Sequence, residues 1–484
     1  MPQTMLQFIR VDRKTPKKRA AKTRKADFDE IYTAYKPAKA AEQAARCSQC
    51  GVPFCQQGCP LSNNIPDWLM LAANARLEEA YDMSAATNNM PEICGRICPQ
   101  DRLCEGSCVI EQSGHGTVTI GAVEKHLTDT AWKEGWVKPI TPPRELDQSV
   151  GIIGAGPAGL AAAEQLRRKG YQVTVYDRYD RGGGLLVYGI PGFKLEKDIV
   201  ARRMRHLEDG GIKFKYNCDI GNTVSFADLR TAHDTVLIAT GVYKPRTLSV
   251  PGLEAGTSIE ALEYLTASNR KGLGDKTAAF SSGTLHAEGK RVVVIGGGDT
   301  AMDCVRTAVR QGAKSVTCLY RRDRSNMPGS AREVQNAEEE GVTFEWLAGP
   351  EALLTDKSGA VKAVCAVRMK LGAADASGRQ APDATGELFE VKADMVICAL
   401  GFDPEDLPTL WGDAQLAVNR WGAVRVDFAT MMTALPGVFA AGDIVRGGSL
   451  VVWAIKDGRD AAEAMHNFMR AQASEVPTKP AMAV

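Results

Sequence analysis

The spacing of apolar positions changes near residue 145. Before it, residues 65–71 and 77–83 place apolar side chains three and four positions apart, which predicts amphipathic helices, and no clear strand alternation is found. Residues 137–144 contain three prolines and predict a linker. From Ser149 onward, short apolar runs alternate with helical segments and glycine turns. This pattern predicts a helical N-terminal part followed by α/β structure with parallel sheets.

The α/β part contains two strand–turn–helix openings, and the first carries a dinucleotide-binding fingerprint. Gly154-x-Gly156-x-x-Gly159 follows an apolar run and precedes an alanine-rich helix. In this motif the first glycine forms the turn, the second lets the backbone approach a pyrophosphate, and the third lets the helix pack on the strand. Asp177 ends the next strand, where an acidic side chain accepts hydrogen bonds from a ribose. A dinucleotide is therefore expected here.

The second opening has the same fingerprint with alanine in the third position, at Gly296, Gly298 and Ala301. Aligning the ends of the following strands places Tyr320 opposite Asp177, and Arg321 and Arg322 come next. An acidic side chain there would repel a 2′-phosphate, whereas two guanidiniums would pair with it. The second site is therefore expected to bind NADP(H) rather than NAD(H). The alternative is that both arginines belong to a solvated turn.

Composition and charge narrow the classes of partner. The 484 residues include 59 Lys and Arg against 58 Asp and Glu, a formal net charge of +1. This near-neutral balance argues against a protein that binds nucleic acid through its overall charge. The sequence contains no apolar run of about eighteen residues, so no membrane span is predicted. Residues 10–25 contain nine Lys or Arg. We interpret this segment as an exposed or docking arm that continues into a helix over residues 27–35. The alternative is that it is a transit peptide. Residues 1–9 lack the apolar core of a signal peptide, so we expect a cytoplasmic, reducing environment.

Eight of the 13 cysteines lie close together in the N-terminal part. Clustered cysteines in a reducing compartment bind metal rather than form disulfides. The eight are Cys47, Cys50, Cys55, Cys59, Cys94, Cys98, Cys104 and Cys108. Eight thiolates suit two 4Fe–4S clusters, and the proline after Cys59 and after Cys98 is typical of a ligand that belongs to the neighbouring cluster.

One division of these ligands is expected. Cys47, Cys50, Cys55 and Cys108 would bind one cluster, and Cys59, Cys94, Cys98 and Cys104 the other. The alternative is a pair of four-cysteine zinc sites. Zinc sites usually contain two Cys-x-x-Cys pairs, and here only Cys47 and Cys50 have that spacing.

Two different dinucleotide sites in one chain resemble the architecture of flavin disulfide reductases, with FAD in the first site and a nicotinamide cofactor in the second. Residues 235–241, 395–401 and 437–443 also resemble segments of that superfamily. The resemblance implies that Asp443 contacts the ribityl chain of FAD. The redox Cys-x-x-Cys pair of the superfamily is missing from the α/β part, so electrons must leave the flavin by another route. The cysteine block offers one.

The expected fold is a two-dinucleotide-binding-domain α/β flavoprotein, with Rossmann-like FAD and NADP domains, preceded by a helical iron–sulfur domain. The iron–sulfur domain would span residues 1–145, the discontinuous FAD domain residues 146–250 and 405–484, and the NADPH domain residues 251–404. FAD is expected at Gly154, Gly156, Pro157, Ala158, Gly159, Asp177, Arg178, Gly184, Leu185, Gly241, Gly442 and Asp443. NADPH is expected at Gly296, Gly298, Asp299, Thr300, Ala301, Arg321 and Arg322. No side chain is assigned as an acid or base, because hydride transfer needs only positioning.

Five segments resemble the family of small (β) subunits of bacterial NADPH-dependent glutamate synthases. They are residues 47–55, 63–68, 92–106, 183–191 and 323–329. The resemblance covers nearly the whole chain. It implies that NADPH reduces FAD and that electrons pass through 4Fe–4S clusters to a large (α) subunit, which makes L-glutamate from 2-oxoglutarate and glutamine. The chain would then work in a hetero-oligomer. The alternative is a subunit of an NADP(H)–ferredoxin-type or electron-bifurcating oxidoreductase.

Four further side chains have two interpretations each. In proteins with a similar cysteine block, a carboxylate or amide at the place of Glu124 sometimes replaces one cysteine, such as Cys94; otherwise Glu124 belongs to a helix surface. Trp453 lies either near the cofactors or in a core. Asp457 and Arg459 are expected to be surface charges of a helix, with a catalytic role as the alternative.

Overall fold

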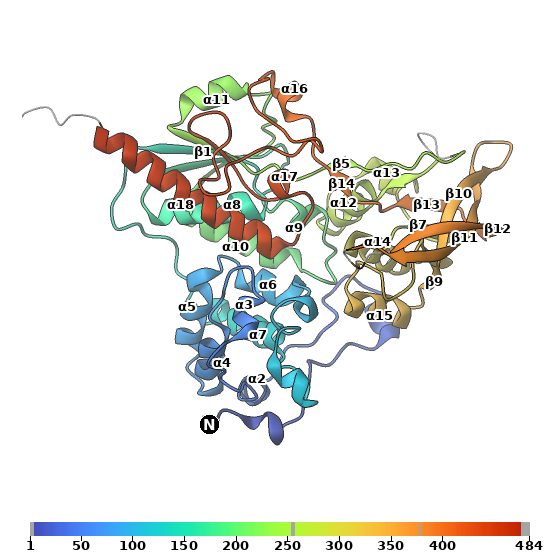
Figure 1. The fold of residues 1–484 in the computed structure, drawn as a ribbon, viewed down its shortest axis with the longest axis horizontal. Coiled ribbons are helices and arrows are strands. Elements are labelled where there is room, and N and C mark those ends of the chain that lie inside the picture. Colours follow the sequence, from blue (N-terminus) through green and yellow to red (C-terminus); the bar gives the residue numbers. More distant parts are fainter. Residues whose placement is uncertain (1–3, 253–256, 377, 379, 476–484) are drawn as a thin grey trace, which may run out of the picture.

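A helical N-terminal part and two α/β units make up the computed structural model (Figure 1). It describes residues 4–252, 257–376, 378 and 380–475. Residues 1–3, which belong to the segment 1–9 that was considered as a signal peptide, lie outside the described residues. The N-terminal helices are α1 (Ala21–Arg24), α2 (Pro37–Ala44), α3 (Phe54–Gln57), α4 (Ile65–Ala73), α5 (Leu77–Thr87), α6 (Pro91–Ile97) and α7 (Ile120–Lys133). Short 3-10 helices lie at Gln7–Ile9, Gln100–Arg102 and Val109–Ser113. The two amphipathic helices predicted from apolar spacing are α4 and α5.

Residues 27–35, expected to continue the basic arm into a helix, are not helical. Their backbone pairs with the arm itself, and the N–H of Arg19 donates to the carbonyl of Ile31 (2.9 Å). Such bonds use groups that a helix would need for its own turns. The longer helix begins at Pro37, where the fixed φ of proline suits a first helical position. The helical expectation for this segment was wrong.

The first α/β unit is built on a parallel sheet in the order β15–β4–β1–β2–β3. Its strands are β1 (Ser149–Ile153), β2 (Gln172–Tyr176), β3 (Lys213–Lys215), β4 (Thr235–Ile238) and β15 (Val438–Ala440). Its helices are α8 (Pro157–Arg168), α9 (Leu185–Tyr188), α10 (Lys197–Asp209), α11 (Phe226–Ala232), α16 (Leu407–Trp411), α17 (Asp443–Arg446) and α18 (Val451–Glu475). Strand β15 pairs with β4, so the unit is completed by a segment that returns from near the end of the chain.

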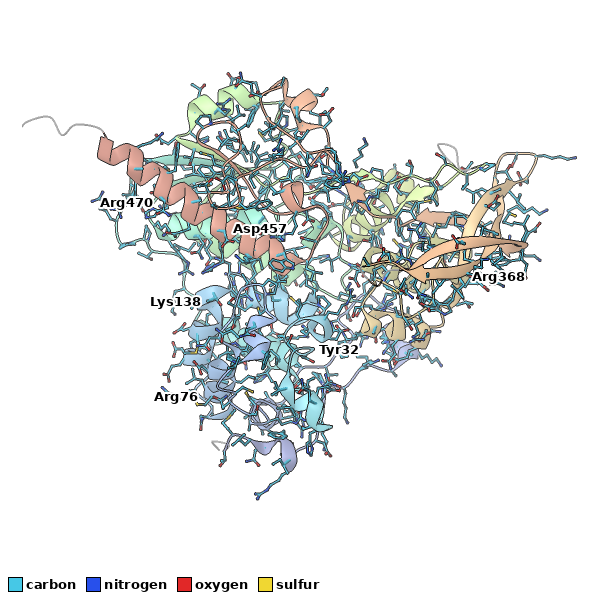
Figure 2. The ribbon with its side chains drawn as sticks, viewed as in Figure 1. Tyr32, Arg76, Lys138, Arg368, Asp457 and Arg470 are labelled. Carbon is cyan, nitrogen blue, oxygen red and sulfur yellow. The ribbon has the colours of Figure 1, made fainter. Side chains whose placement is uncertain are left out.

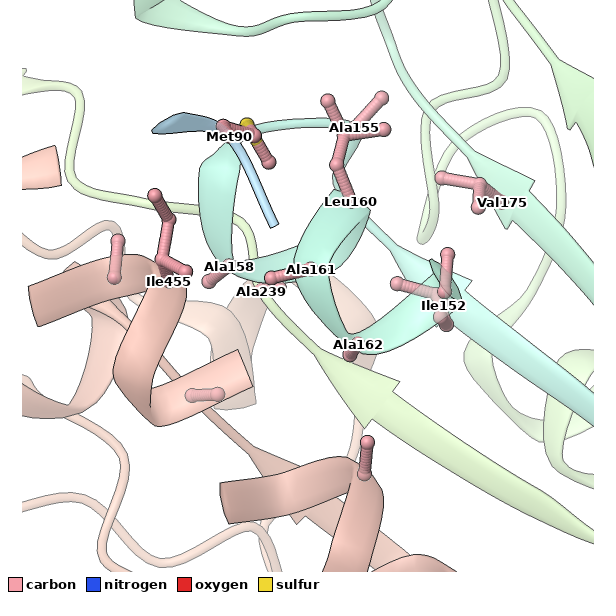
Figure 3. Packing of buried hydrophobic residues seen from close by; sticks show 14 of the residues in the cluster. Met90, Ile152, Ala155, Ala158, Leu160, Ala161, Ala162, Val175, Ala239 and Ile455 are labelled. Carbon is pink, nitrogen blue, oxygen red and sulfur yellow. The ribbon is translucent and has the colours of Figure 1, made fainter. Parts of the chain in front are cut away.

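Helix α8 lies at the centre of the core of this unit. Figure 3 shows Ala158 of α8 beside Ile455 of α18, with Ile152 of β1 across the helix. The two helices approach closely because α18 carries a glycine at the crossing: a Cβ at Gly458 would lie 2.1 Å from the carbonyl oxygen of Ala158. Met90 of the N-terminal part belongs to the same buried cluster, so α6 and the residues around it share a core with the first unit, while most of the N-terminal helices pack around a cluster of their own.

The second α/β unit repeats the plan with a parallel sheet in the order β6–β13–β7–β8–β9. Its strands are β6 (Ile259–Glu260), β7 (Arg291–Ile295), β8 (Ser315–Tyr320), β9 (Thr343–Trp346) and β13 (Met395–Cys398). Its helices are α12 (Ala261–Gly272), α13 (Ala278–Ser281), α14 (Asp299–Arg310) and α15 (Ala331–Glu339). In both units a fingerprint turn connects the middle strand, β1 or β7, to a helix, as the sequence predicts.

One further sheet was not predicted. β10 (Ala348–Thr355), β11 (Val361–Ala374) and β12 (Gln380–Lys392) form an antiparallel sheet, whereas only parallel sheets were expected. Consecutive strands joined by short turns can pair only in this sense. A short antiparallel ribbon, β5 (Lys244–Pro245) with β14 (Phe402–Asp403), lies where the chain crosses between the two units. None of the helices in the described part of the chain is both long and apolar enough to cross a membrane.

Candidate cofactor-binding site

The two fingerprints form the same strained turn. Gly154 has φ +108° and Gly296 has φ +141°, a backbone conformation that side chains rarely adopt. A Cβ at these positions would lie 2.3 Å from the carbonyl oxygen of Ala239 and 2.2 Å from that of Ala399, respectively. Both turns therefore require glycine on two independent grounds.

The second and third fingerprint positions differ in what they face. A Cβ at Gly156 or Gly298 would meet no heavy atom within 4 Å, so the backbone at the N-terminus of α8 and of α14 is open to a ligand. A Cβ at Gly159 would lie 2.0 Å from the carbonyl oxygen of Gly154, whereas Ala301 fits fully buried in the second turn. Both helix ends offer free N–H groups and positive dipole to an anion.

A cavity of about 1230 Å³ is lined by the N-terminal part and by both α/β units. The expected FAD residues that line it are Gly154, Gly156, Pro157, Ala158, Asp177, Gly184, Leu185, Gly241 and Asp443. Of the expected NADPH residues, Asp299 and Thr300 line it. Of the eight clustered cysteines, Cys98 lines it. The cavity thus joins the first dinucleotide turn, the start of α14 and one candidate cluster ligand in a single space, whereas Gly296, Gly298, Ala301, Arg321 and Arg322 do not line it. Tyr32 lines it too, between the N-terminal part and the second unit (Figure 2).

Two acidic side chains face this cavity from the first unit. Asp177, at the end of β2, accepts hydrogen bonds from the N–H groups of Ala155 (2.7 Å) and Tyr179 (2.8 Å). Asp443, at the start of α17, accepts one from Ser449 Oγ (2.7 Å). Burial raises the pKa of both carboxyl groups, and these donors partly oppose it. Arg178, also expected at FAD, is instead paired with Glu405 (2.9 Å) and does not line the cavity.

The two arginines expected at a 2′-phosphate follow β8 directly. Arg321 is exposed and Arg322 is half-buried. The Arg322 Nε is buried and has no hydrogen-bond partner among the residues described. The preceding Tyr320 packs its ring against Gly297, where a Cβ would lie 2.3 Å from the ring. The exposed guanidinium of Arg321 is accessible to an anionic ligand, whereas the Nε of Arg322 is enclosed by protein.

The first group of four cysteines lines one small cavity in the N-terminal part. Cys47, Cys50, Cys55 and Cys108 face it, with apolar neighbours from α3 and α4. Burial raises the pKa of Cys55 to about 12. In the described parts of the chain, no three His, Cys, Asp or Glu side chains surround a point that one metal ion could occupy. Four thiolates around a common cavity suit a cluster, in which each binds its own iron, better than the alternative of zinc.

The second group, Cys59, Cys94, Cys98 and Cys104, also lies together. The pKa of Cys98 is raised first by its contact with Cys94 and then by burial. Glu124 belongs to this group, because its charge acts on Cys59, Cys98 and Cys104. Burial raises the pKa of Glu124 to about 8, and Asn88 donates to its carboxylate (3.4 Å). The alternative of a surface position for Glu124 was therefore wrong.

Two family profiles match the chain. Residues 24–136 match dihydropyrimidine dehydrogenase domain II, 4Fe-4S cluster, and residues 148–458 match the pyridine nucleotide-disulphide oxidoreductases. The glutamate synthase [NADPH] small chain of Azospirillum brasilense is 63% identical over 97% of this chain and 98% of its own length. The chain belongs to the glutamate synthase [NADPH] small-chain family. The family member of Escherichia coli K12 is 44% identical over 97% of this chain and 100% of its own length.

This chain is also similar to proteins that are not named glutamate synthase small chains. The putative oxidoreductase AegA of Escherichia coli K12 is 43% identical over 94% of this chain, which covers 69% of AegA. The structure of FprA from Mycobacterium tuberculosis in complex with NADPH superposes with a TM-score of 0.58 at 20% identity, covering 70% of this chain and 88% of FprA. That likeness concerns the fold. The expected fold class, an iron–sulfur domain before a two-dinucleotide-binding flavoprotein, is confirmed.

The basic arm of residues 10–25 was expected to be exposed or to dock on a partner. Six of its nine basic residues are exposed, and the arm also binds this chain. Arg24 is 1% exposed and donates to Glu339 (2.7 Å) and Glu340 (3.0 Å) at the end of α15. Lys18 donates to Glu339 as well (2.8 Å). In Figure 1 the blue α1 accordingly lies beside α15. The arm therefore connects the N-terminal part to the second α/β unit.

The charges expected on the surface of the last helix also make internal contacts. Asp457, labelled on α18 in Figure 2, is buried and accepts from Arg446 Nε (3.0 Å). The guanidinium of Arg446 lies 4.6 Å from the ring centre of Trp453. Arg459 donates to Asn89 Oδ1 (2.8 Å) in the N-terminal part. Trp453 is half-buried and does not line the cavity, although its neighbour Ala454 does.

Among the residues that line the cavity and that sequence reasoning missed are Phe193, Lys194 and Arg332. Phe193 and Lys194 lie between α9 and α10, and Arg332 lies in the first turn of α15. Arg332 donates to the side chain of Gln100 (2.9 Å), close to Cys98. The only signal for the first two was their place directly after residues 183–191, one of the segments that carry the family resemblance.

Proposed function

We propose that this chain is the electron-input subunit of an NADPH-dependent glutamate synthase. FAD binds the first α/β unit, NADPH the second, and 4Fe–4S clusters the N-terminal part. The observation that carries the proposal is the single cavity, which the N-terminal ends of α8 and α14 and Cys98 all line. When bound, FAD accepts a hydride from NADPH and passes the electrons singly to iron.

The residues of the chain bind and orient these cofactors. The open backbone at Gly156 holds the pyrophosphate of FAD, Asp177 accepts from its ribose, and Asp443 contacts its ribityl chain. The open backbone at Gly298 holds the pyrophosphate of NADPH in the same way. Arg321 and Arg322 pair with its 2′-phosphate, which the exposure of the Arg321 guanidinium supports. No side chain has to move a proton, because the reaction depends on alignment of the two rings.

We further propose two clusters and three domains. Cys47, Cys50, Cys55 and Cys108 bind one cluster. The other is bound by four ligands from Cys59, Cys94, Cys98, Cys104 and Glu124, and it is the one nearer the flavin because Cys98 lines the shared cavity. The domains are residues 1–145, residues 146–250 with 405–484, and residues 251–404. The ribbon of β5 and β14 at the two crossings supports the last two bounds.

The partner follows from the family name rather than from a contact in this chain. A small chain implies a large chain, which receives the electrons and forms L-glutamate from 2-oxoglutarate and glutamine. The proposed assembly is a cytoplasmic hetero-oligomer. The likeness to AegA favours a second candidate, an oxidoreductase subunit with the same cofactors that reduces a different acceptor such as ferredoxin.

An anaerobic titration with NADPH tests the proposal, combined with iron, acid-labile sulfide and flavin analysis. We expect one FAD per chain, bleaching of the flavin by NADPH, and about eight iron atoms per chain, since two clusters hold four each. Glutamate formation on adding the large chain supports glutamate synthase. Reduction of the flavin without glutamate formation, but with reduction of ferredoxin, favours the second candidate.

A further inference from the structure

Helix α14 carries three charged side chains on one buried face. Asp303, Arg306 and Arg310 are spaced three and four positions apart, so they lie above one another along the helix. All three are buried. Buried charges are unfavourable unless they are paired, so this face must be covered by groups that match it.

Two consecutive residues of the first α/β unit cover part of this face. Lys194 Nζ donates to Asp303 Oδ1 (2.8 Å), and both side chains are largely buried. The ring of Phe193, 1% exposed, lies 4.4 Å from the guanidinium of Arg306 and 3.9 Å from that of Arg310. The first unit thus inserts an ion-pairing group and an aromatic ring into the second, and cations stack favourably on such a ring.

Lys194 is the cation that neutralises the buried carboxylate of Asp303. Arg306 is paired with Glu333 and Glu340, so it is already neutralised within the second unit. Burial lowers the pKa of Lys194, and the carboxylates of Asp303 and its acidic neighbours raise it by more, so the side chain stays an ammonium. In the described residues, Lys194 is the side chain that donates to Asp303.

The position of this contact gives it a consequence for the reaction. Helix α14 begins at the second fingerprint, and Asp299 and Thr300 of its first turn line the shared cavity. Phe193 and Lys194 line the same cavity. Whatever fixes α14 against the first unit also fixes the NADPH turn relative to the FAD turn. Hydride transfer requires the reacting atoms to approach within about 3–3.5 Å, so a small displacement of α14 lowers its rate.

We propose that Phe193 and Lys194 are positioning residues that hold α14 at the distance needed for hydride transfer between the two nucleotide sites. This inference rests on the proposed function, because it assumes that NADPH at α14 reduces FAD at α8. It adds that different residues bind NADPH and align it for hydride transfer. The fingerprint turn binds the cofactor, and the Phe193–Lys194 contact aligns it.

Rapid-mixing reduction of the FAD-loaded chain by NADPH tests this separation. The variants are Lys194→Met, Asp303→Asn, their double variant and Phe193→Leu. The control is Lys169→Met, which removes a lysine at the same distance from a carboxylate (Glu463, 2.8 Å) but within the first unit. We expect the limiting rate constant of flavin reduction to fall at least about tenfold in each test variant. The Kd for NADPH should change less than about threefold, and the control should match the unchanged chain.

The double variant and the flavin content distinguish alignment from general damage. If Lys194 and Asp303 act through one contact, the double variant loses no more than either single variant. A limiting rate constant unchanged in Lys194→Met overturns the inference. So does a loss confined to the Kd for NADPH, an additive double variant, or a loss of rate explained by loss of FAD. If NADPH fails to reduce the flavin of the unchanged chain, the proposed function itself fails.

Discussion

Gly298→Ala separates the folding role of a fingerprint glycine from its binding role. Gly298 has φ −85° and ψ 178°, an extended conformation that any residue adopts, and no atom lies within 4 Å of its Cβ position. Alanine therefore fits the cofactor-free chain without strain. Alanine has less freedom in the unfolded chain, which favours folding by about 0.4–1 kcal/mol, but it is a poorer N-cap than glycine. Because these two effects oppose each other, we expect the free energy of unfolding to change by less than about 1 kcal/mol.

The added methyl group should nevertheless obstruct NADPH. It occupies the face on which the pyrophosphate approaches the backbone at the start of α14, and the charge-assisted hydrogen bonds there lengthen or break. Loss of one such bond costs about 1.5–3 kcal/mol, which raises the Kd about tenfold to a hundredfold. Calorimetric titration of the FAD-loaded chain with NADP⁺ measures the Kd, and denaturant unfolding measures stability.

A matched control is Gly272→Ala, near the end of α12, where a Cβ also meets open space. It should raise stability by up to about 1 kcal/mol, since glycine weakens helices, and leave the Kd for NADP⁺ unchanged. The reasoning is refuted if Gly298→Ala binds NADP⁺ as tightly as the unchanged chain. It is also refuted if the variant loses more than about 2 kcal/mol of stability, because that exceeds the loss expected from a poorer N-cap and the backbone there would then need glycine.

The arginines after β8, the cysteine block and the buried glutamates each allow another test. Replacing Arg321 and Arg322 with alanine should raise the Kd for NADPH about tenfold and leave that for NADH unchanged in fluorescence titrations; equal losses would contradict 2′-phosphate recognition. Cys98→Ala should lower iron by about half at constant FAD, with Cys218→Ala as the control, and unchanged iron would remove Cys98 from the ligands. Burial alone would raise the pKa of Glu340, but the arginines of α14 lower it to about 2. Its stabilisation is therefore present above about pH 4.5 and lost as the pH falls toward 2, and Glu340→Gln should flatten that part of an acid-unfolding curve followed by circular dichroism.

Features fixed by local geometry were predictable from the sequence. Gly154 and Gly296 follow apolar strands, and the turn that lets a helix return over a sheet leaves room for no side chain there. The helices α4 and α5 were visible because their apolar spacing depends only on neighbouring residues. The proline after Cys59 and Cys98 similarly indicated how the cysteines would be grouped, and each expected group of four lies together.

Contacts between distant segments were not predictable in this way. The charge of the basic arm was plain, but nothing local distinguishes Glu340 from the other acidic residues as the partner of Arg24. The prediction that Asp457 is a surface charge was wrong for a related reason. Helix α18 is covered on more than one side, by α8 and by Arg446 of the preceding segment, so the usual contrast between one buried and one exposed face does not hold.

The way the parts are joined explains why charged contacts decide the geometry of the cavity. The N-terminal part and the first α/β unit share an apolar core that includes Met90. In the described residues, the buried clusters of the second unit draw only on residues 248–400. It is held to the rest by the packing of Leu273 on the core of the first unit, by the ring of Phe193 and by polar contacts. These polar contacts include Lys194 with Asp303, Arg24 with Glu340 and Arg332 with Gln100. An apolar interface tolerates small shifts because it has no direction, whereas each of these contacts fixes a donor against an acceptor. The unit that carries the second fingerprint is therefore the one whose position depends most on polar side chains.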